Sequence, residues 1–220
     1  MRALITGGSR GIGRATVQLF EQHGYEVIAP SRAELDLLNS DSVEAFIDVH
    51  RDETIDTIVN NAGINDLALI ENADDETITR MLEVDLVSPI RLLRGFAPAL
   101  KRSQAGRVVN IGSIWAAVSK PGRGLYSAAK QGMHGITNAL ALELAADGVL
   151  VNTVCPGFTA TELTTQNNTP EQIAVIEQDI PLGRMARPEE IAAAVYWLGS
   201  TENSYITGQK ILVDGGFTIR

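Results

Sequence analysis

Short apolar runs alternate with longer amphipathic stretches along the whole chain of 220 residues. The apolar runs predict strands, and the stretches with apolar residues three or four positions apart predict helices. The expected strands are 2–6, 26–29, 55–59, 107–112, 149–154 and 210–213, and the expected helices are 12–23, 41–50, 75–101, 124–146, 170–178 and 188–198. Regular alternation of this kind is typical of an α/β fold with a parallel sheet covered on both faces.

One connection is shorter than the others. Between strand 26–29 and helix 41–50 lies only the segment 30–40, which is too short for a full helix and a full strand. We therefore expect an abbreviated crossover, with Leu35-Asp36-Leu37 as a stub of strand at the sheet edge. The polar segment 157–169 is expected to be a loop, and Thr169 to begin the next helix with a capping box.

Composition narrows the class of protein. Apolar residues make up 45% and charged residues 20%, and the length suits one domain over residues 1–220. The formal charge of −9 argues against nucleic-acid binding, which needs a cationic surface. The single cysteine, Cys155, excludes an internal disulfide, and the three histidines lack metal-ligand spacing, so no metal site is expected. No stretch resembles a signal peptide or a membrane span, so we expect a cytoplasmic protein without membrane contact.

A glycine-rich turn, Thr6-Gly7-Gly8-Ser9-Arg10-Gly11-Ile12-Gly13, joins the first expected strand to the first expected helix. Glycines permit a tight turn and close approach of the backbone to a pyrophosphate, and the helix N-terminus supplies amide donors. Glycines after a strand also form ordinary turns. The position of this turn, at the first strand–helix junction, favours a dinucleotide-binding site of the Rossmann type.

Two arginines bear on which dinucleotide would bind. Arg10 lies inside the glycine turn, and Arg32 follows the second strand in Pro30-Ser31-Arg32, where an adenine ribose would lie. A basic residue there suits a 2′-phosphate, whereas an acidic one would bind a free ribose hydroxyl. NADP(H) is therefore favoured over NAD(H), unless both arginines are merely solvated surface.

Ser113, Tyr126 and Lys130 form the most informative group of residues. Tyr126 and Lys130 are four residues apart, which places both side chains on one helix face. A phenol has a pKa of ~10, and a neighbouring ammonium lowers it toward a useful acid–base range. Ser113 ends an apolar strand and can hydrogen-bond the same substrate oxygen. Tyr and Lys at this spacing also occur by chance in helices.

Together these motifs resemble the short-chain dehydrogenase/reductase family in its compact single-domain branch. The resemblance covers nearly the whole chain and keeps the family's motif order. Its motifs are the glycine turn, Asn60-Asn61-Ala62-Gly63, the Ser113, Tyr126 and Lys130 group, the turn 156–161, and the closing stretch 206–216. It implies a Rossmann-type doubly wound parallel sheet in one dinucleotide-binding and catalytic domain.

The resemblance also implies site residues. Ser113, Tyr126 and Lys130 correspond to the catalytic residues, and Asp36 to an aspartate that meets the adenine. The cofactor-binding residues it implies are Gly7, Ser9, Arg10, Gly11, Ile12, Gly13, Ser31, Arg32, Asp36, Asn61, Ala62, Gly63, Tyr126, Lys130, Pro156, Gly157, Thr159 and Thr161. Family members commonly form tetramers through the helix carrying Tyr and Lys, so a homotetramer or homodimer is expected.

Asp85 departs from the family pattern. The family usually places an asparagine at this point of the long helix, to hold a water chain that leads to the lysine. Asp85 either supports that water in place of the asparagine, shifts the pKa of the lysine, or is a helix polar residue with no catalytic role. The complete proton relay depends on which of these holds.

The expected activity is hydride transfer between a nicotinamide and a carbonyl or secondary alcohol, with NADP(H) as cofactor and a small molecule as substrate. A 3-oxoacyl thioester reductase is the default substrate class that the resemblance implies; a sugar, a steroid-like alcohol or a small ketone are alternatives. Ile114, Trp115, Phe158 and the loop 157–169 are expected to line the substrate site. The competing interpretations are a cofactor-binding regulatory or scaffold protein, and an extended-branch sugar-nucleotide epimerase that needs a further substrate region.

Overall fold

The computed structural model describes residues 1–166 and 168–220. One sheet of six parallel strands occupies its centre, in the order β2-β1-β3-β4-β5-β6. The strands are β1 (Arg2–Ile5), β2 (Glu26–Ile28), β3 (Thr57–Asn60), β4 (Arg107–Ile111), β5 (Leu150–Pro156) and β6 (Lys210–Val213). From β1 the chain moves outward to β2, then returns past β1 and continues from β3 to β6. This reversal confirms the predicted doubly wound α/β fold.

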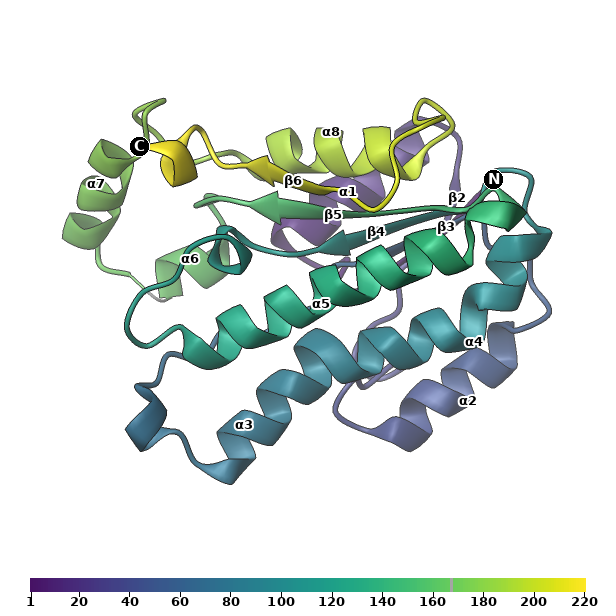
Figure 1. The fold of residues 1–220 in the computed structure, drawn as a ribbon, viewed down its shortest axis with the longest axis horizontal. Coiled ribbons are helices and arrows are strands. Elements are labelled where there is room, and N and C mark those ends of the chain that lie inside the picture. Colours follow the sequence, from purple (N-terminus) through teal and green to yellow (C-terminus); the bar gives the residue numbers. More distant parts are fainter. Residues whose placement is uncertain (167) are drawn as a thin grey trace.

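Helices cover both faces of the sheet (Figure 1). One face carries α1 (Gly11–Gln22) and α8 (Pro188–Gly199), and the other carries α2 (Ser40–His50), α4 (Ser88–Arg102) and α5 (Gly124–Glu143). Further helices are α3 (Asp75–Leu82), α6 (Glu162–Gln166) and α7 (Pro170–Asp179). Figure 1 shows α6 and α7 at the end of the sheet toward which β5 and β6 run. Among the described residues, no helix combines the length and the apolar character that a membrane crossing requires.

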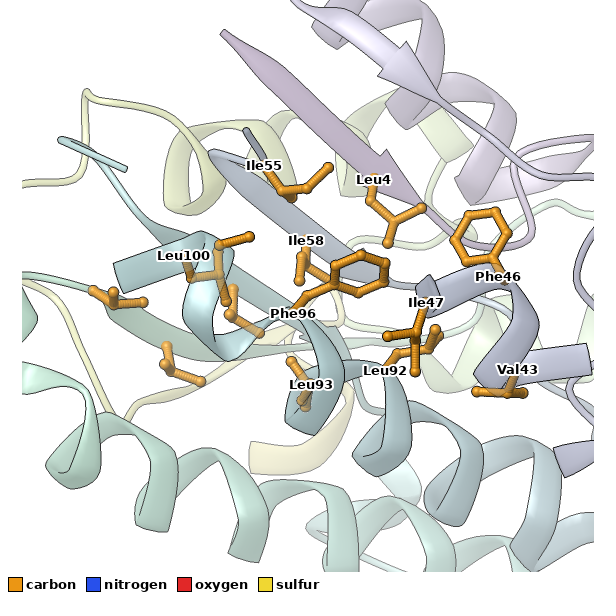
Figure 2. Close-up of a cluster of buried hydrophobic side chains, with 14 of the residues drawn as sticks. Leu4, Val43, Phe46, Ile47, Ile55, Ile58, Leu92, Leu93, Phe96 and Leu100 are labelled. Atoms are coloured by element: carbon orange, nitrogen blue, oxygen red, sulfur yellow. The ribbon is translucent and has the colours of Figure 1, made fainter. Parts of the chain in front are cut away.

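Two separate apolar clusters hold the helices to the sheet. Successive strand residues point to opposite faces, so Leu4 joins the cluster beneath α2 and α4 while its neighbour Ile5 joins the cluster beneath α1 and α8. Ile58 and Val59 in β3 divide in the same way. Figure 2 shows the first cluster, in which side chains from α2 and α4 meet the strands. Continuous apolar strands are therefore required, because both faces are buried.

The pairing of α2 with α4 depends on a glycine. A Cβ atom at Gly95 in α4 would lie 2.6 Å from a methyl carbon of Ile47 in α2. Ile47 is almost completely buried, and Phe96 beside Gly95 is fully buried. The missing side chain thus lets the two helices approach closely enough for Ile47 to reach the core.

The short connection between β2 and α2 is confirmed, but the predicted stub of strand is wrong. Residues 32–34 and 37–38 form turns, residues 35 and 36 are irregular, and the sheet ends at β2. Leu35 and Leu37 are both buried in the cluster beneath α2 and α4. Asp36 accepts a hydrogen bond from the Leu38 amide at 3.0 Å. The alternation of apolar and polar residues in Leu35-Asp36-Leu37 therefore has another cause than a strand. Two leucines of a loop are buried in the core, and the Asp36 side chain stabilises the turn between them.

The predicted helix 75–101 is interrupted. The structure has α3, then a π-helical turn over Glu83–Val87, and then α4. A π-turn holds one residue more than an α-helical turn and changes the direction in which side chains point. Here the turn contains Asp85, which is buried. A second difference is α6, which lies within the segment expected to be a loop.

The cysteine provides a test of the packing. Cys155 in β5 is fully buried, and burial raises the pKa of its thiol to about 11. The reactive thiolate is therefore almost absent near neutral pH. We expect native protein at pH 8 not to react with Ellman's reagent over minutes, and denatured protein to release one thiol per chain. Rapid reaction of the native protein would contradict the packing of β5.

Candidate active site

The glycine turn is packed against the chain that follows β3. Gly7 has a φ of +67°, a left-handed conformation that glycine adopts readily. A Cβ at Gly13 would lie 2.1 Å from the Gly7 carbonyl oxygen, so α1 begins directly on the turn. Asn61 fixes the turn from the other side, because its Nδ2 donates to the Thr6 carbonyl at 2.9 Å and the Gly7 carbonyl at 3.1 Å. The turn is therefore held by hydrogen bonds and close packing within the protein itself.

The N-terminus of α1 is open. Arg10 occupies the capping position, but no side chain of residues 1–166 and 168–220 accepts a hydrogen bond from the first amides of α1, and the first turn of α1 contains no acidic residue. Such amides need a partner, and an anion satisfies both the hydrogen bonds and the helix dipole. The glycine cradle and the open helix end together fit the pyrophosphate of a dinucleotide.

A cavity of about 360 Å³ extends from this turn to the carboxyl ends of β4 and β5. It brings together most of the residues implied by the sequence. These are Gly7, Ser9, Arg10, Gly11, Ile12, Gly13, Asn61, Ala62, Gly63, Ser113, Tyr126, Lys130, Pro156, Gly157, Thr159 and Thr161. Ile114, Trp115 and Phe158, expected near the substrate, also line it.

Ser113, Tyr126 and Lys130 meet in this cavity. Ser113 begins the short 3-10 helix Ile114–Ala116, and its Oγ accepts a hydrogen bond from the Trp115 amide at 3.2 Å. Tyr126 and Lys130 lie in α5, with Lys130 Nζ 5.5 Å from the centroid of the Tyr126 ring. Nζ also donates to the Ile111 carbonyl at 3.1 Å, which ties α5 to the end of β4.

Asp85 is the partner of Lys130. Its Oδ1 lies 3.0 Å from Lys130 Nζ, and both side chains are almost fully buried. The other oxygen, Oδ2, accepts a hydrogen bond from the Ile64 amide at 3.3 Å. A Cβ at Gly63 would lie 2.5 Å from Asp85 Oδ1, so a side chain there would displace the carboxylate. The π-turn thus presents Asp85 to the lysine from behind the cavity, and Asp85 is not a bystander on the helix surface.

The charges around Tyr126 act in opposite directions. Burial raises the pKa of the Tyr126 hydroxyl, Lys130 and the Ser113 hydroxyl lower it, and Asp85 raises it, with a net upward direction. Lys130 lowers the pKa of Tyr126, but burial outweighs this effect, so the expectation that the pKa of Tyr126 is lowered overall is wrong. Burial lowers the pKa of Lys130, whereas the Asp85 carboxylate and Tyr126 raise it, again with a net upward direction. Lys130 is therefore held as an ammonium.

Three predicted cofactor residues lie outside the cavity: Ser31, Arg32 and Asp36. Arg32 is 77% exposed and lies 3.6 Å from Asp36 Oδ1. Glu34, which the sequence did not single out, accepts a hydrogen bond from the Ser31 amide at 2.8 Å. A carboxylate therefore lies close to the end of β2. The sequence Ser31–Glu34 could have indicated this carboxylate, because the side chain of the fourth residue of a turn can accept a hydrogen bond from the amide of the first.

Sequence reasoning also missed Arg123 and Glu162. Arg123 lines the cavity at the start of α5, one turn before Tyr126, and is 4% exposed. Glu162 in α6 lines the cavity as well, and its carboxylate pairs with Arg10 at 3.1 Å. For Arg123 the available signal was a cation three residues before the candidate tyrosine. For Glu162 there was none, because α6 was expected to be loop.

Comparison with known proteins places these features in one family. A family model described as enoyl-(acyl carrier protein) reductase matches residues 29–218. The chain is 36% identical to the 3-oxoacyl-[acyl-carrier-protein] reductase FabG of Vibrio cholerae, over 97% of this chain and 96% of that protein. It is 34% identical to the uncharacterized oxidoreductase YmfI of Bacillus subtilis, over 98% of both chains.

Solved structures agree. A putative NAD(P)-dependent gluconate 5-dehydrogenase from Beutenbergia cavernae, with NADP bound at low occupancy, superposes with a TM-score of 0.94 at 30% identity and covers 100% of this chain and 97% of that one. The aldohexose dehydrogenase of Thermoplasma acidophilum gives 0.92 at 32% identity, with 100% and 94% covered. The sequence comparisons and the structural comparisons therefore identify similar proteins over nearly the whole chain. The chain belongs to the short-chain dehydrogenase/reductase family of oxidoreductases.

Proposed function

We propose that this chain is an NADP(H)-dependent carbonyl reductase in which Ser113, Tyr126 and Lys130 handle the substrate oxygen. The observation that carries the proposal is the meeting of these three side chains with the glycine turn in one cavity. The nicotinamide supplies hydride chemistry when it is bound. The relatives named as 3-oxoacyl-[acyl-carrier-protein] reductases make 3-oxoacyl compounds the first substrate class to test.

The chain's own residues move a proton. Tyr126 donates its hydroxyl proton to the substrate oxygen during reduction and accepts it in the reverse direction. Ser113 is 7% exposed, and its hydroxyl orients that oxygen and stabilises the negative charge that develops on it. The Lys130 ammonium favours the phenolate that forms. A raised pKa keeps Tyr126 protonated at neutral pH, which suits donation and therefore reduction.

Asp85 influences the protonation of both Tyr126 and Lys130. Its negative charge raises the pKa of both Tyr126 and Lys130. An asparagine at this position would keep a hydrogen-bond acceptor for the Ile64 amide but would leave the Lys130 charge uncompensated. The carboxylate therefore biases the site toward a protonated tyrosine.

Cofactor preference rests on two arginines. Arg10 and Arg32 are both well exposed, and in the part of the chain that the structure describes each forms one surface ion pair, Arg10 with Glu162 and Arg32 with Asp36. Such pairs contribute about 0–1 kcal/mol, so a phosphate can displace the carboxylate. Arg32, in the turn that follows β2, supports recognition of the 2′-phosphate of NADP(H).

Assembly is supported by exposed apolar side chains. Leu142 near the end of α5 is 81% exposed, and Ile219 near the C-terminus is 87% exposed. The resemblance implies contacts through these two regions, so we propose a homotetramer or homodimer. Both side chains would then be covered by another copy of the chain.

The role of Tyr126 can be tested directly. We expect Tyr126→Phe to reduce turnover of NADPH with 3-oxoacyl esters by about 10²–10⁴-fold, since the general acid is lost. NADPH oxidation is followed at 340 nm, and Tyr205→Phe, at a side chain that is 94% exposed, serves as the control. Undiminished turnover in Tyr126→Phe would contradict the acid role. A wild-type chain that reduces no carbonyl would favour a cofactor-binding regulatory protein.

Asp85→Asn tests the electrostatic balance. Removing the carboxylate lowers the pKa of Tyr126, because Asp85 raises it. In alcohol oxidation, which needs the phenolate, the rise of kcat with pH is expected to move to lower pH. Asp48→Asn, at an exposed carboxylate paired with Arg51, is the control. An unmoved profile would assign Asp85 a purely structural role.

Titration of NADPH and NADH tests the cofactor assignment. We expect Arg32→Ala to weaken NADPH binding about 10-fold and NADH binding little, because only NADPH carries the phosphate. Arg51→Ala, at an exposed arginine in the turn that follows α2, controls for the loss of one surface charge. Equal affinity of the wild-type chain for the two cofactors would contradict the proposal.

A further inference from the structure

Arg123 is a buried cation inside the cavity that contains Ser113 and Tyr126. It occupies the position before α5, one turn before Tyr126, and only 4% of its surface is exposed. Its guanidinium carbon lies 5.2 Å from the centroid of the Trp115 ring. The same ring is approached by Lys120, whose Nζ lies 5.4 Å from the centroid.

The guanidinium has hydrogen-bonding capacity that the protein does not use. Its Nε and Nη1 are buried and have no hydrogen-bond partner in residues 1–166 and 168–220. The guanidinium lies over the Trp115 ring, and an indole side chain offers a donor but no acceptor, so this contact leaves Nε and Nη1 without a conventional hydrogen-bond partner in the part of the chain that the structure describes. No carboxylate of the described residues forms an ion pair with it. A buried cation without an anion is costly, and burial lowers the pKa of Arg123.

The planar fork of an arginine matches the two oxygens of a carboxylate. Arg123 directly precedes α5, Tyr126 lies in the first turn of α5, and both side chains line the same cavity. A small molecule can therefore place its carbonyl oxygen at Tyr126 and a carboxylate at Arg123. We propose that Arg123 binds the carboxylate of the substrate, and that the substrates are oxo acids and the corresponding hydroxy acids. The inference rests on the proposed function and narrows its substrate class.

A free acid fits these groups better than a neutral thioester. A thioester oxygen accepts a hydrogen bond but leaves the guanidinium charge uncompensated, whereas a carboxylate supplies both. The chain has a formal charge of −9, which opposes the approach of a large anionic carrier. The carboxylate is unchanged by the reaction; the carbonyl alone gains a hydride and the Tyr126 proton.

Matched pairs of acids and methyl esters test this assignment. Pyruvate, acetoacetate and levulinate place the carboxylate at increasing distance from the carbonyl, and each has a neutral methyl ester of nearly the same shape. We expect the wild-type chain to prefer the best acid over its ester by about 10–100-fold in kcat/KM, the value of a charge-assisted hydrogen bond. Arg123→Gln is expected to abolish this preference, and Arg123→Lys to keep part of it.

Lys120→Gln is the matched control. Lys120 approaches the same Trp115 ring but does not line the cavity that contains Tyr126. The preference for the acid is expected to survive in this variant. A preference that persists in Arg123→Gln, or that falls equally in Lys120→Gln, would overturn a direct contact between Arg123 and the carboxylate.

A binding measurement separates this inference from the proposed function. In a Trp197→Phe background Trp115 is the remaining tryptophan of the chain, and its fluorescence reports ligands beside Arg123. We expect butyrate to change this fluorescence saturably, and Arg123→Gln to weaken its binding about 10-fold or more. Butyrate binding without reduction of any carbonyl would sink the proposed function and leave the anion site standing. Reduction of esters and acids at equal rates, without butyrate binding, would sink the anion site alone.

Discussion

The parallel direction of all six strands is the constraint on which the site depends. Thr6, Asn61 and Ser113 each follow the carboxyl end of a strand, and these three strands are neighbours in the order β1-β3-β4. Parallel strands end at the same edge of a sheet, so segments far apart in the sequence meet there. The glycine turn and the Ser113, Tyr126 and Lys130 group therefore share one cavity without any long loop.

The Lys130–Asp85 pair illustrates the cost of a preorganised site. Both groups are almost completely buried. Removing two charges from water costs several kcal/mol each, and their attraction does not reliably offset it, so the pair is poor evidence of stability. Its consequence is geometric: the ammonium is held by Asp85 and the Ile111 carbonyl, at a fixed place beneath Tyr126. Fixed charges need no reorganisation when charge develops on a substrate.

Sequence reasoning recovered the fold because short, continuous apolar runs are direct evidence of strands buried on both faces. It recovered the glycine turn and the Tyr126–Lys130 pair because both are local patterns with fixed spacing. It failed at Leu35 and Leu37, where two core leucines in a loop have the same period as a strand. It also missed the Arg123 guanidinium, because only the folded structure shows that two of its nitrogens are buried without a hydrogen-bond partner among the described residues.

The π-helical turn has a consequence for how this chain tolerates changes in length. It holds one residue more than the corresponding α-helical turn. Losing a residue between Glu83 and Val87 would restore an unbroken α-helix and leave α3 and α4 in nearly the same rotational phase, because the turn would close with one residue fewer. Met81, which is fully buried, would keep its place in the core, but the residues inside the turn would point in new directions and the Asp85 carboxylate would move away from the lysine. The extra residue thus sets the direction of the side chains inside the turn, while the two halves of the long helix keep their packing.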